Sequence, residues 1–321
     1  MHAKHVLWVP LAAGVLIEWV GKILCCLALP LPWAARAIEW SLAARFLPFS
    51  LRRQVLENLS CVFGGSYTRA ELDLLGREYL HVLLGGPIDF FLGLRITPPA
   101  IAELVVVEGR EHMDQALSRG KGVIAVTGHY SFMLRGLFVA GALGYTVNAV
   151  VRAPREVSWP GAGMVLERVF ETLSRKTTVR WLFPGGAFAQ AVERLAHNEI
   201  VCFAMDVPRV EEKSGGMRVR FLGGEAVFPA SLLRLAAETG APIVPTFVFP
   251  RAGSPGYVLR AWPPLIPERR DPEGVRRSLQ TCADLLGSLI LRYPAHWWLW
   301  RDLHIFWRPS SPGTGAAHAG P

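Results

Sequence analysis

A histidine stands where an apolar run of the chain ends. Residues 122–126 read Gly-Val-Ile-Ala-Val, Thr127 and Gly128 follow, and His129 precedes a second apolar segment. This order predicts a buried strand, a turn and then a helix, with His129 at the carboxyl end of the strand, where open α/β sheets bind their ligands. Imidazole suits general-base catalysis near neutral pH, and N–H groups at the start of the helix could hold a developing oxyanion. The alternative is a structural histidine bonded to a loop carbonyl.

No carboxylate that could orient this histidine occurs on the next helical turn. That position carries Leu134, Arg135 follows it, and no Asp or Glu occurs between His129 and Arg155. In a histidine–acid pair the carboxylate fixes the imidazole tautomer and stabilises the imidazolium that forms. A replacement acid must therefore come from a distant part of the sequence.

Two distant acids are candidates. Asp206 ends the apolar run 200–205, which predicts a second buried strand and places the acid at a carboxyl edge, although a lone Asp there also commonly forms a turn. Glu225 lies in the glycine-containing segment 221–229, which reads either as a hairpin turn or as a substrate loop ahead of a helix. If the protein is an active enzyme, we expect Asp206 or Glu225 to be the acid that orients His129.

Other polar and aromatic residues could complete a site. Arg152 ends the apolar segment 147–151 at the same expected edge and could bind a phosphate or a thioester carrier; a solvated surface arginine is the alternative. The aromatic residues between 297 and 307 could form core or a belt around a lipid entrance. Three further histidines without partners at metal-ligand spacing are taken as structural, and no metal site is expected: His197, His296 and His304.

Hydrophobic periodicity places these residues in an α/β fold. Residues 34–95 predict helices, and a capping box of Thr68 and Glu71 starts one of them. Beyond them, strands and helices alternate, which favours a central, mostly parallel or mixed sheet flanked by helices. Strands are expected at 105–107, 122–126, 146–151, 200–205, 218–221, 243–249 and 257–261, and helices at 111–118, 132–142, 163–174, 187–197, 230–239 and 273–293.

The N-terminal residues are almost entirely apolar. Residues 6–33 carry only Glu18 and Lys22 as charges, which lie four positions apart and could pair on a helix. A spanning helix, an interfacial helix and a cleaved signal peptide are the possibilities, and we expect an uncleaved anchor. The expected organisation is a membrane anchor or interfacial helix over 1–33, an α/β domain over 34–308 and a disordered tail over 309–321.

Composition limits the class of protein. The 321 residues are 51% hydrophobic and only 19% charged, and the mean hydropathy is +0.28, which suggests contact with a bilayer. The net charge of +8 suits anionic lipids, phosphorylated substrates or acidic carrier proteins. No zinc-finger spacing or RNA-binding signature accompanies the charge, so nucleic acid is not an expected partner. Five cysteines without a CxxC pattern indicate a reduced compartment.

Several short segments follow one another in a specific order between Arg52 and Trp307. They are 53–59, 116–122, 127–129, 150–152, 203–206, 221–223, 235–245, and 292–294 with Trp298 and Trp300. In order and spacing they resemble the late acyltransferases of lipid A biosynthesis, within the lysophospholipid acyltransferase superfamily. That family carries Asp or Glu five positions after its histidine, where this chain has Leu134.

The resemblance implies a membrane-bound enzyme on the cytoplasmic face of a Gram-negative inner membrane. It would move a fatty acyl chain from acyl carrier protein, less often from coenzyme A, to a hydroxyl of a glycolipid, without a cofactor beyond the thioester co-substrate. His129 would be the base, and Arg152 and Asp206 match substrate-contacting positions. The same expectation of substrate contact extends to four further residues: Gly128, Ser131, Arg135 and Gly223.

Three hypotheses follow for the function. The first is an active O-acyltransferase on lipid A or another cell-surface glycolipid, in which Asp206 or Glu225 replaces the acid missing at Leu134. The second is a catalytically impaired homologue that binds a lipid or an acyl carrier. The third is a thioesterase that uses water in place of the lipid acceptor.

Overall fold

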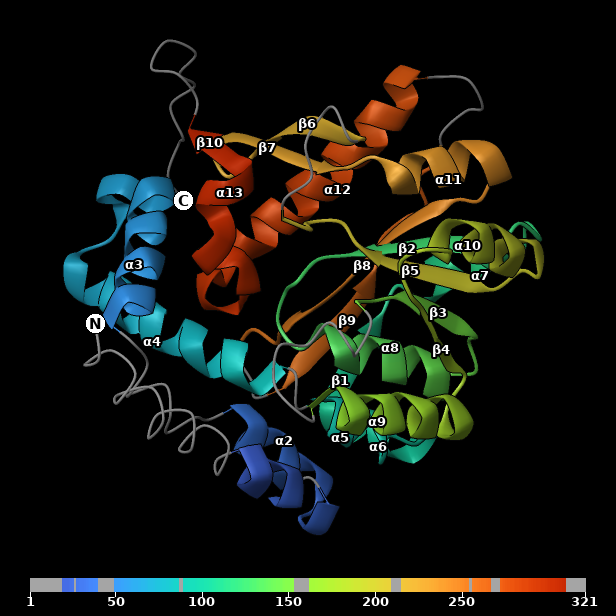
Figure 1. The fold of residues 1–321 in the computed structure, drawn as a ribbon, viewed down its shortest axis with the longest axis horizontal. Helices are drawn as coiled ribbons and strands as arrows, with labels where there is room; N and C mark the ends of the chain where they lie inside the picture. Colours follow the sequence, from blue (N-terminus) through green and yellow to red (C-terminus); the bar gives the residue numbers. More distant parts are fainter. Residues whose placement is uncertain are drawn as a thin grey trace.

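The fold is a mixed α/β arrangement around one large sheet (Figure 1). The computed structural model describes residues 19–25, 27–39, 49–86, 89–152, 162–208, 215–253, 256–266 and 272–309. Within those ranges, no helix combines the length and apolar character needed to cross a bilayer. Most of the expected anchor, residues 1–18, and the expected tail from 310 onward lie outside the described residues.

In the described part of the chain, seven strands form the central sheet in the order β1-β9-β8-β2-β5-β3-β4. Strands β8, β2, β5, β3 and β4 run parallel to one another, while β9 is antiparallel to β8 and parallel to β1. The sheet is therefore mixed, because the two strands at one edge, β1 and β9, run antiparallel to the other five. Its strands are β1 (Val105–Glu108), β2 (Val123–Thr127), β3 (Val147–Val150), β4 (Val179–Leu182), β5 (Ile200–Ala204), β8 (Ile243–Pro250) and β9 (Tyr257–Ala261).

Both faces of the sheet are covered. Alternate residues of β2 enter two different cores, with Ile124 and Val126 in one and Val123 and Ala125 in the other. Such burial on both faces explains why the run 122–126 is continuously apolar rather than alternating. Figure 1 shows α10, α11 and α12 over one face and α8 and α9 over the other. These helices span Met133–Ala142 (α8), Ala162–Lys176 (α9), Ala187–Ala196 (α10), Ser231–Thr239 (α11) and Pro272–Arg292 (α12).

Helices before the sheet and short elements after it complete the domain. The capping box is present, because Thr68 accepts from the Glu71 N–H and the Glu71 carboxylate accepts from the Thr68 N–H. Early helices are α2 (Leu31–Glu39), α3 (Phe49–Phe63), α4 (Arg69–Gly85), α5 (Asp89–Gly93), α6 (Pro98–Leu104) and α7 (Arg110–Leu117), with the 3₁₀ turn η2 (Gly64–Ser66) after α3. The chain continues beyond α12 through η6 (Pro294–His296), η7 (Trp298–Asp302) and α13 (Leu303–Phe306).

A second, smaller sheet corrects one expectation. The hairpin interpretation of the segment 221–229 is confirmed and the substrate-loop interpretation is wrong, because Gly224–Pro229 forms strand β7 between β6 (Gly216–Phe221) and β10 (Trp307–Pro309). The turn consists of Leu222 and Gly223, with φ of +50° and +72°. Two central residues with positive φ match the right-handed twist of a hairpin, which explains the glycine.

Candidate active site

The strand register brings His129 beside Asp206. Strands β2 and β5 are parallel neighbours, and Thr127 pairs with Ala204 at their carboxyl ends. The pairing continues past the strands, since the Met205 N–H donates to the Thr127 carbonyl at 2.9 Å. His129 lies two residues after Thr127, and Asp206 lies two residues after Ala204, so both follow the ends of neighbouring strands. The acid absent from position 134 is thus supplied by the adjacent strand.

The Asp206 carboxylate holds the imidazole in a fixed orientation. His129 Nδ1 lies 2.8 Å from Asp206 Oδ1, and the His129 backbone N–H donates to the same carboxylate at 2.9 and 3.0 Å. Asp206 is completely buried, whereas the His129 side chain is 26% exposed. A carboxylate accepts hydrogen bonds, so Nδ1 carries a proton, and in the neutral form of the imidazole Nε2 has a lone pair that can take a proton from a substrate.

Two neighbours keep Asp206 in place. The indole N–H of Trp297 donates to Asp206 Oδ2 at 2.8 Å. A Cβ on Gly128 would lie only 3.2 Å from Oδ2 and 3.0 Å from Leu286, so glycine at this position allows the carboxylate to approach the turn. Burial by itself raises the pKa of Asp206, but the charge of a protonated His129 and hydrogen bonds from His129 and Trp297 outweigh it, and the pKa lies below its usual value. Asp206 is therefore ionised at neutral pH.

Residues 296–298 of the C-terminal segment hold the turn that carries His129 in place through hydrogen bonds. The Trp298 N–H donates to the His129 carbonyl at 2.8 Å, and its indole N–H donates to the Ser131 carbonyl at 2.8 Å. The Ser131 N–H donates back to the His296 carbonyl at 2.6 Å, and Tyr130 forms a bridge with Trp297. Ser131 takes a left-handed φ of +51°, which these bonds stabilise.

The oxyanion site suggested by the sequence would lie further along, at the start of helix α8, and the N–H groups of the preceding turn are engaged within the protein. The N–H of His129 donates to Asp206, that of Tyr130 to the Gly128 carbonyl at 2.7 Å, and that of Ser131 to His296. Three consecutive N–H groups are therefore already engaged inside the protein. The backbone of this turn orients the histidine rather than receiving a substrate oxygen.

An apolar cavity of about 80 Å³ lies between the sheet and helix α8. Leu134 lines it, together with Met133 and Leu137 of the same helix, and Thr127 lies in its wall just before the turn that carries His129. On the sheet side the wall consists of small and aliphatic residues, including Ala149. Such a lining suits a hydrocarbon chain and offers few polar partners.

Comparison with known proteins assigns the family. Residues 8–305 match the sequence model of the bacterial lipid A biosynthesis acyltransferases. The chain belongs to this family. Phosphatidylinositol mannoside acyltransferases from two strains of Mycobacterium tuberculosis are each 26% identical to it over 196 residues, which is 60% of this chain and 57% of the length of these curated relatives.

One solved structure is also similar in part. The 1-acyl-sn-glycerophosphate acyltransferase PlsC of Thermotoga maritima has a TM-score of 0.38 and 17% sequence identity to this chain. The match covers 76% of this chain and 96% of that one.

The remaining candidate site residues of this lipid A acyltransferase family member lie in different surroundings. Arg152 follows β3 and is exposed. Ser131 is fully buried, and its hydroxyl lies 3.2 Å from His296 Nδ1. Arg135, 1% exposed, pairs with Asp89 at 3.1 Å and stacks over Phe132. Ser131 and Arg135 therefore stabilise the protein interior beneath the turn.

The two candidates in the small sheet are separated from this chemistry. Glu225 lies on β7, half exposed, and pairs with Arg218 of the neighbouring strand at 2.9 Å. Gly223 belongs to the hairpin turn beside it. Of the two proposed replacement acids, the structure joins Asp206 to His129, and Glu225 serves a cross-strand ion pair.

Two features were missed from the sequence. The indole of Trp297 bonds to the acid, although its segment was expected to be core or a lipid belt. The apolar cavity was not expected at all. For Trp297 the only local signal was an aromatic cluster, which does not say where an indole N–H points.

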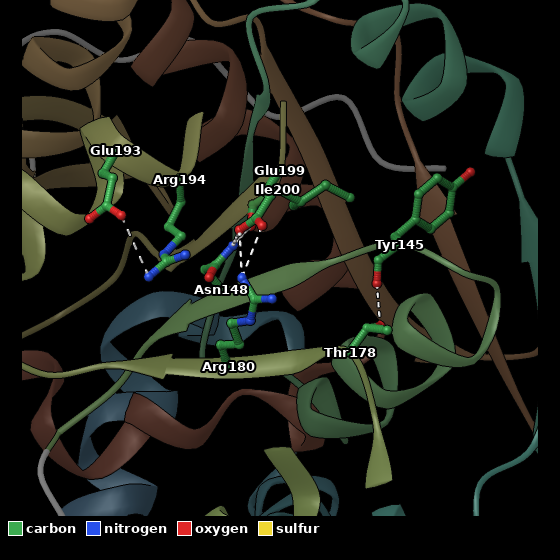
Figure 2. Close-up of polar contacts among 8 residues, drawn as sticks. All are labelled: Tyr145, Asn148, Thr178, Arg180, Glu193, Arg194, Glu199 and Ile200. Atoms are coloured by element: carbon green, nitrogen blue, oxygen red, sulfur yellow. Dashed lines mark hydrogen bonds and ion pairs between the residues drawn. The ribbon is translucent and has the colours of Figure 1, made fainter. Parts of the chain in front are cut away.

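A second polar cluster lies at the opposite edge of the sheet (Figure 2). The Asn148 amide donates to Glu199 at 2.9 Å and to the Ile200 carbonyl at 3.1 Å, and Arg180 pairs with Glu199 at 2.9 Å. These residues connect the amino-terminal halves of β3, β4 and β5. Ligands of open α/β sheets bind at the carboxyl ends, so this cluster stabilises the strand order rather than forming a second active site.

Proposed function

We propose that this protein is an O-acyltransferase that moves a fatty acyl chain from an acyl thioester to a hydroxyl of a membrane glycolipid. The observation that supports it most is the buried Asp206 bonded to the partly exposed His129 in a family of lipid acyltransferases. The relatives named phosphatidylinositol mannoside acyltransferases support a glycolipid acceptor. Acyl carrier protein is the proposed donor, with coenzyme A thioesters as the alternative, and no further cofactor is required.

The proposed reaction is a direct transfer with His129 as general base. Nε2 of His129 takes the proton of the acceptor hydroxyl while its oxygen attacks the thioester carbonyl carbon. Asp206 stabilises the imidazolium that forms, since it is ionised and bonded to Nδ1. When the tetrahedral intermediate collapses, the C–S bond breaks, and the leaving thiolate receives the proton from the imidazolium. The products are the acylated lipid and the free carrier thiol.

The apolar cavity is the proposed site of the acyl chain. It begins near Thr127, two residues before the base, and extends under the sheet along α8. A chain bound there would leave its thioester at the carboxyl edge of the sheet, where His129 is partly exposed. Arg152, exposed at the end of the neighbouring strand β3, is the proposed contact for an anionic group of donor or acceptor.

We further propose that the protein works at the cytoplasmic face of the inner membrane. Large apolar side chains are exposed near the N-terminus, among them Leu24, Leu27 and Trp33. Together with the net charge of +8, they suit binding at the interface of an anionic bilayer. Trp33→Ser with Leu24→Ser should weaken co-sedimentation with anionic vesicles; unchanged binding would contradict this placement.

The test is acyl transfer by purified full-length protein. The assay combines an acyl carrier protein thioester with inner-membrane lipids and detects acylated lipid by mass spectrometry. His129→Ala should abolish transfer, whereas His197→Ala, which removes an exposed histidine after α10, should retain it. Equal transfer by wild type and His129→Ala would contradict the proposal. His129-dependent release of free fatty acid without an acceptor would instead identify a thioesterase, and inactive wild type with intact acyl binding would identify an impaired homologue.

A further inference from the structure

The second oxygen of Asp206 has a dedicated donor. His129 Nδ1 bonds to Oδ1, while Oδ2 accepts from the Trp297 indole N–H at 2.8 Å. Trp297 is completely buried and packs against three aromatic rings. Its centroid lies 5.6 Å from Phe221, 5.0 Å from Trp300 and 6.2 Å from Phe306, each close to edge-on. The indole is therefore fixed in position before any substrate binds.

A carboxylate needs such a fixed donor to point in one direction. The terminal torsion of an Asp side chain has a broad energy minimum, so one hydrogen bond does not define the plane of the carboxylate. The His129 backbone N–H reaches both oxygens and leaves this rotation open. A charge-assisted bond from a rigid indole to Oδ2 defines the plane and aims Oδ1 at Nδ1.

The same residue also ties this plane to the catalytic turn. The Trp297 backbone forms a bridge with Tyr130, the residue after His129. One residue thus touches the acid through its side chain and the base-bearing turn through its backbone. Any displacement of the C-terminal segment would move the imidazole and the carboxylate together.

We propose that Trp297 is a positioning residue for acyl transfer: its indole N–H orients the Asp206 carboxylate so that His129 keeps its Nδ1 proton and presents Nε2 to the acceptor hydroxyl. This inference rests on the proposed function. It differs from a purely structural role, for which the neighbouring Trp300 serves as a matched comparison. Trp300 is equally buried and donates its indole N–H to the Pro294 carbonyl at 2.7 Å.

Paired variants of the full-length chain test the proposal. Trp297→Phe removes the N–H and keeps an aromatic ring, and Trp300→Phe does the same at the comparison site. Because a hydrogen bond to a buried charged group is lost, Trp297→Phe should lower kcat about 10- to 100-fold, while the KM values of donor and acceptor stay the same. Trp300→Phe should keep kcat within about threefold at a similar loss of Tm. Equal effects of the two variants on kcat would overturn the proposal.

The imidazole itself supplies a readout that does not depend on turnover. Proton and nitrogen-15 NMR of histidine-labelled protein detects the proton shared by His129 Nδ1 and Asp206. This resonance should shift or broaden in Trp297→Phe and stay unchanged in Trp300→Phe. If Trp297→Phe does not fold, β-(benzothienyl)alanine at position 297 replaces only the N–H by sulfur and keeps the ring. An unchanged His129 signal and unchanged kcat in that variant would overturn the proposal.

The outcomes separate this inference from the proposed function. Loss of transfer in His129→Ala with normal transfer in Trp297→Phe would leave the acyltransferase proposal in place and reject the role of Trp297. Transfer that is independent of His129 would reject the proposed function itself. A shifted His129 signal in Trp297→Phe would still show that the indole positions the pair.

Discussion

Replacing Asp206 by asparagine removes one charge from the site and keeps the shape of the side chain. The carboxylate accepts from the His129 N–H, from His129 Nδ1 and from the Trp297 indole. Asparagine has one acceptor oxygen, so its NH₂ group must face either Nδ1 or the indole N–H. Facing Nδ1 forces the imidazole proton onto Nε2, and facing the indole leaves two donors opposed. The first orientation removes the lone pair of Nε2, whereas the second keeps the tautomer but loses the indole bond and the charge that would stabilise the imidazolium.

The expected loss is large because the tautomer and the imidazolium both depend on this acid. The same exchange in serine proteases lowers kcat about 10⁴-fold, which corresponds to roughly 5.5 kcal/mol of transition-state stabilisation. We expect Asp206→Asn to lower kcat by about 10³- to 10⁴-fold. The unsatisfied buried donor should also reduce the free energy of unfolding by about 1–3 kcal/mol.

Glu225→Gln is the matched control, since it makes the same chemical change in a half-exposed cross-strand pair. An exposed ion pair contributes about 0–1 kcal/mol, so this variant should transfer acyl chains at nearly the wild-type rate. Both variants are compared in the carrier-thioester assay after urea titration has given the folded fraction of each. Asp206→Asn with more than a tenth of wild-type kcat, or an equal loss in Glu225→Gln, would refute the reasoning.

Three further predictions concern residues around the pair. Leu134→Glu should lower the free energy of unfolding by about 4 kcal/mol or more in urea titrations, because apolar burial shifts a carboxyl pKa by up to 3–5 units. The same substitution should not restore transfer to the Asp206→Asn variant. Rescue of transfer would contradict the assignment of Asp206 as the partner of His129. Ala149→Leu should fill the cavity and shift selectivity toward shorter acyl chains in a competition between donors of different length, and unchanged selectivity would place the chain elsewhere. Burial, with a smaller effect of Arg135, lowers the pKa of His296 to about 4. As the pH falls, the His296 side chain is therefore protonated in the unfolded chain before it is protonated in the folded protein. The free energy of unfolding should fall by up to about 3 kcal/mol between pH 6.5 and 4. His296→Asn should remove this dependence of stability on pH.

Local sequence predicted most of the helices and strands because each carries its own hydrophobic period. It placed His129 and Asp206 at strand ends for the same reason. It could not choose between Asp206 and Glu225, since that choice depends on which strands are neighbours. The order in the sheet puts β5 beside β2 although β3 and β4 come between them in the chain. Strand β4 was missed because Arg180 interrupts the short apolar run Val179–Leu182.

The hairpin of the small sheet was one of two open interpretations of its segment. Gly223 and Gly224 allowed either a hairpin turn or a substrate loop, whereas Glu225 is exposed and Ala226 and Phe228 are buried, which is the alternation of a strand. These nine residues contain both a turn and a strand, and the glycines indicated only the turn. The bond from Trp297 lay beyond any local pattern, because it joins residues 91 positions apart.

The leucine at position 134 is compatible with acyl transfer for a geometric reason. A carboxylate on α8 would stand in the wall of the apolar cavity that Leu134 now lines. Asp206 reaches His129 from the end of β5, approaching Nδ1 from the protein interior beside Trp297 and Gly128 rather than through that wall. Under the proposed function, the acid then orients the base while the first turn of α8 stays apolar for the hydrocarbon chain. In that proposal the carboxylate and the acyl chain would lie on different sides of His129.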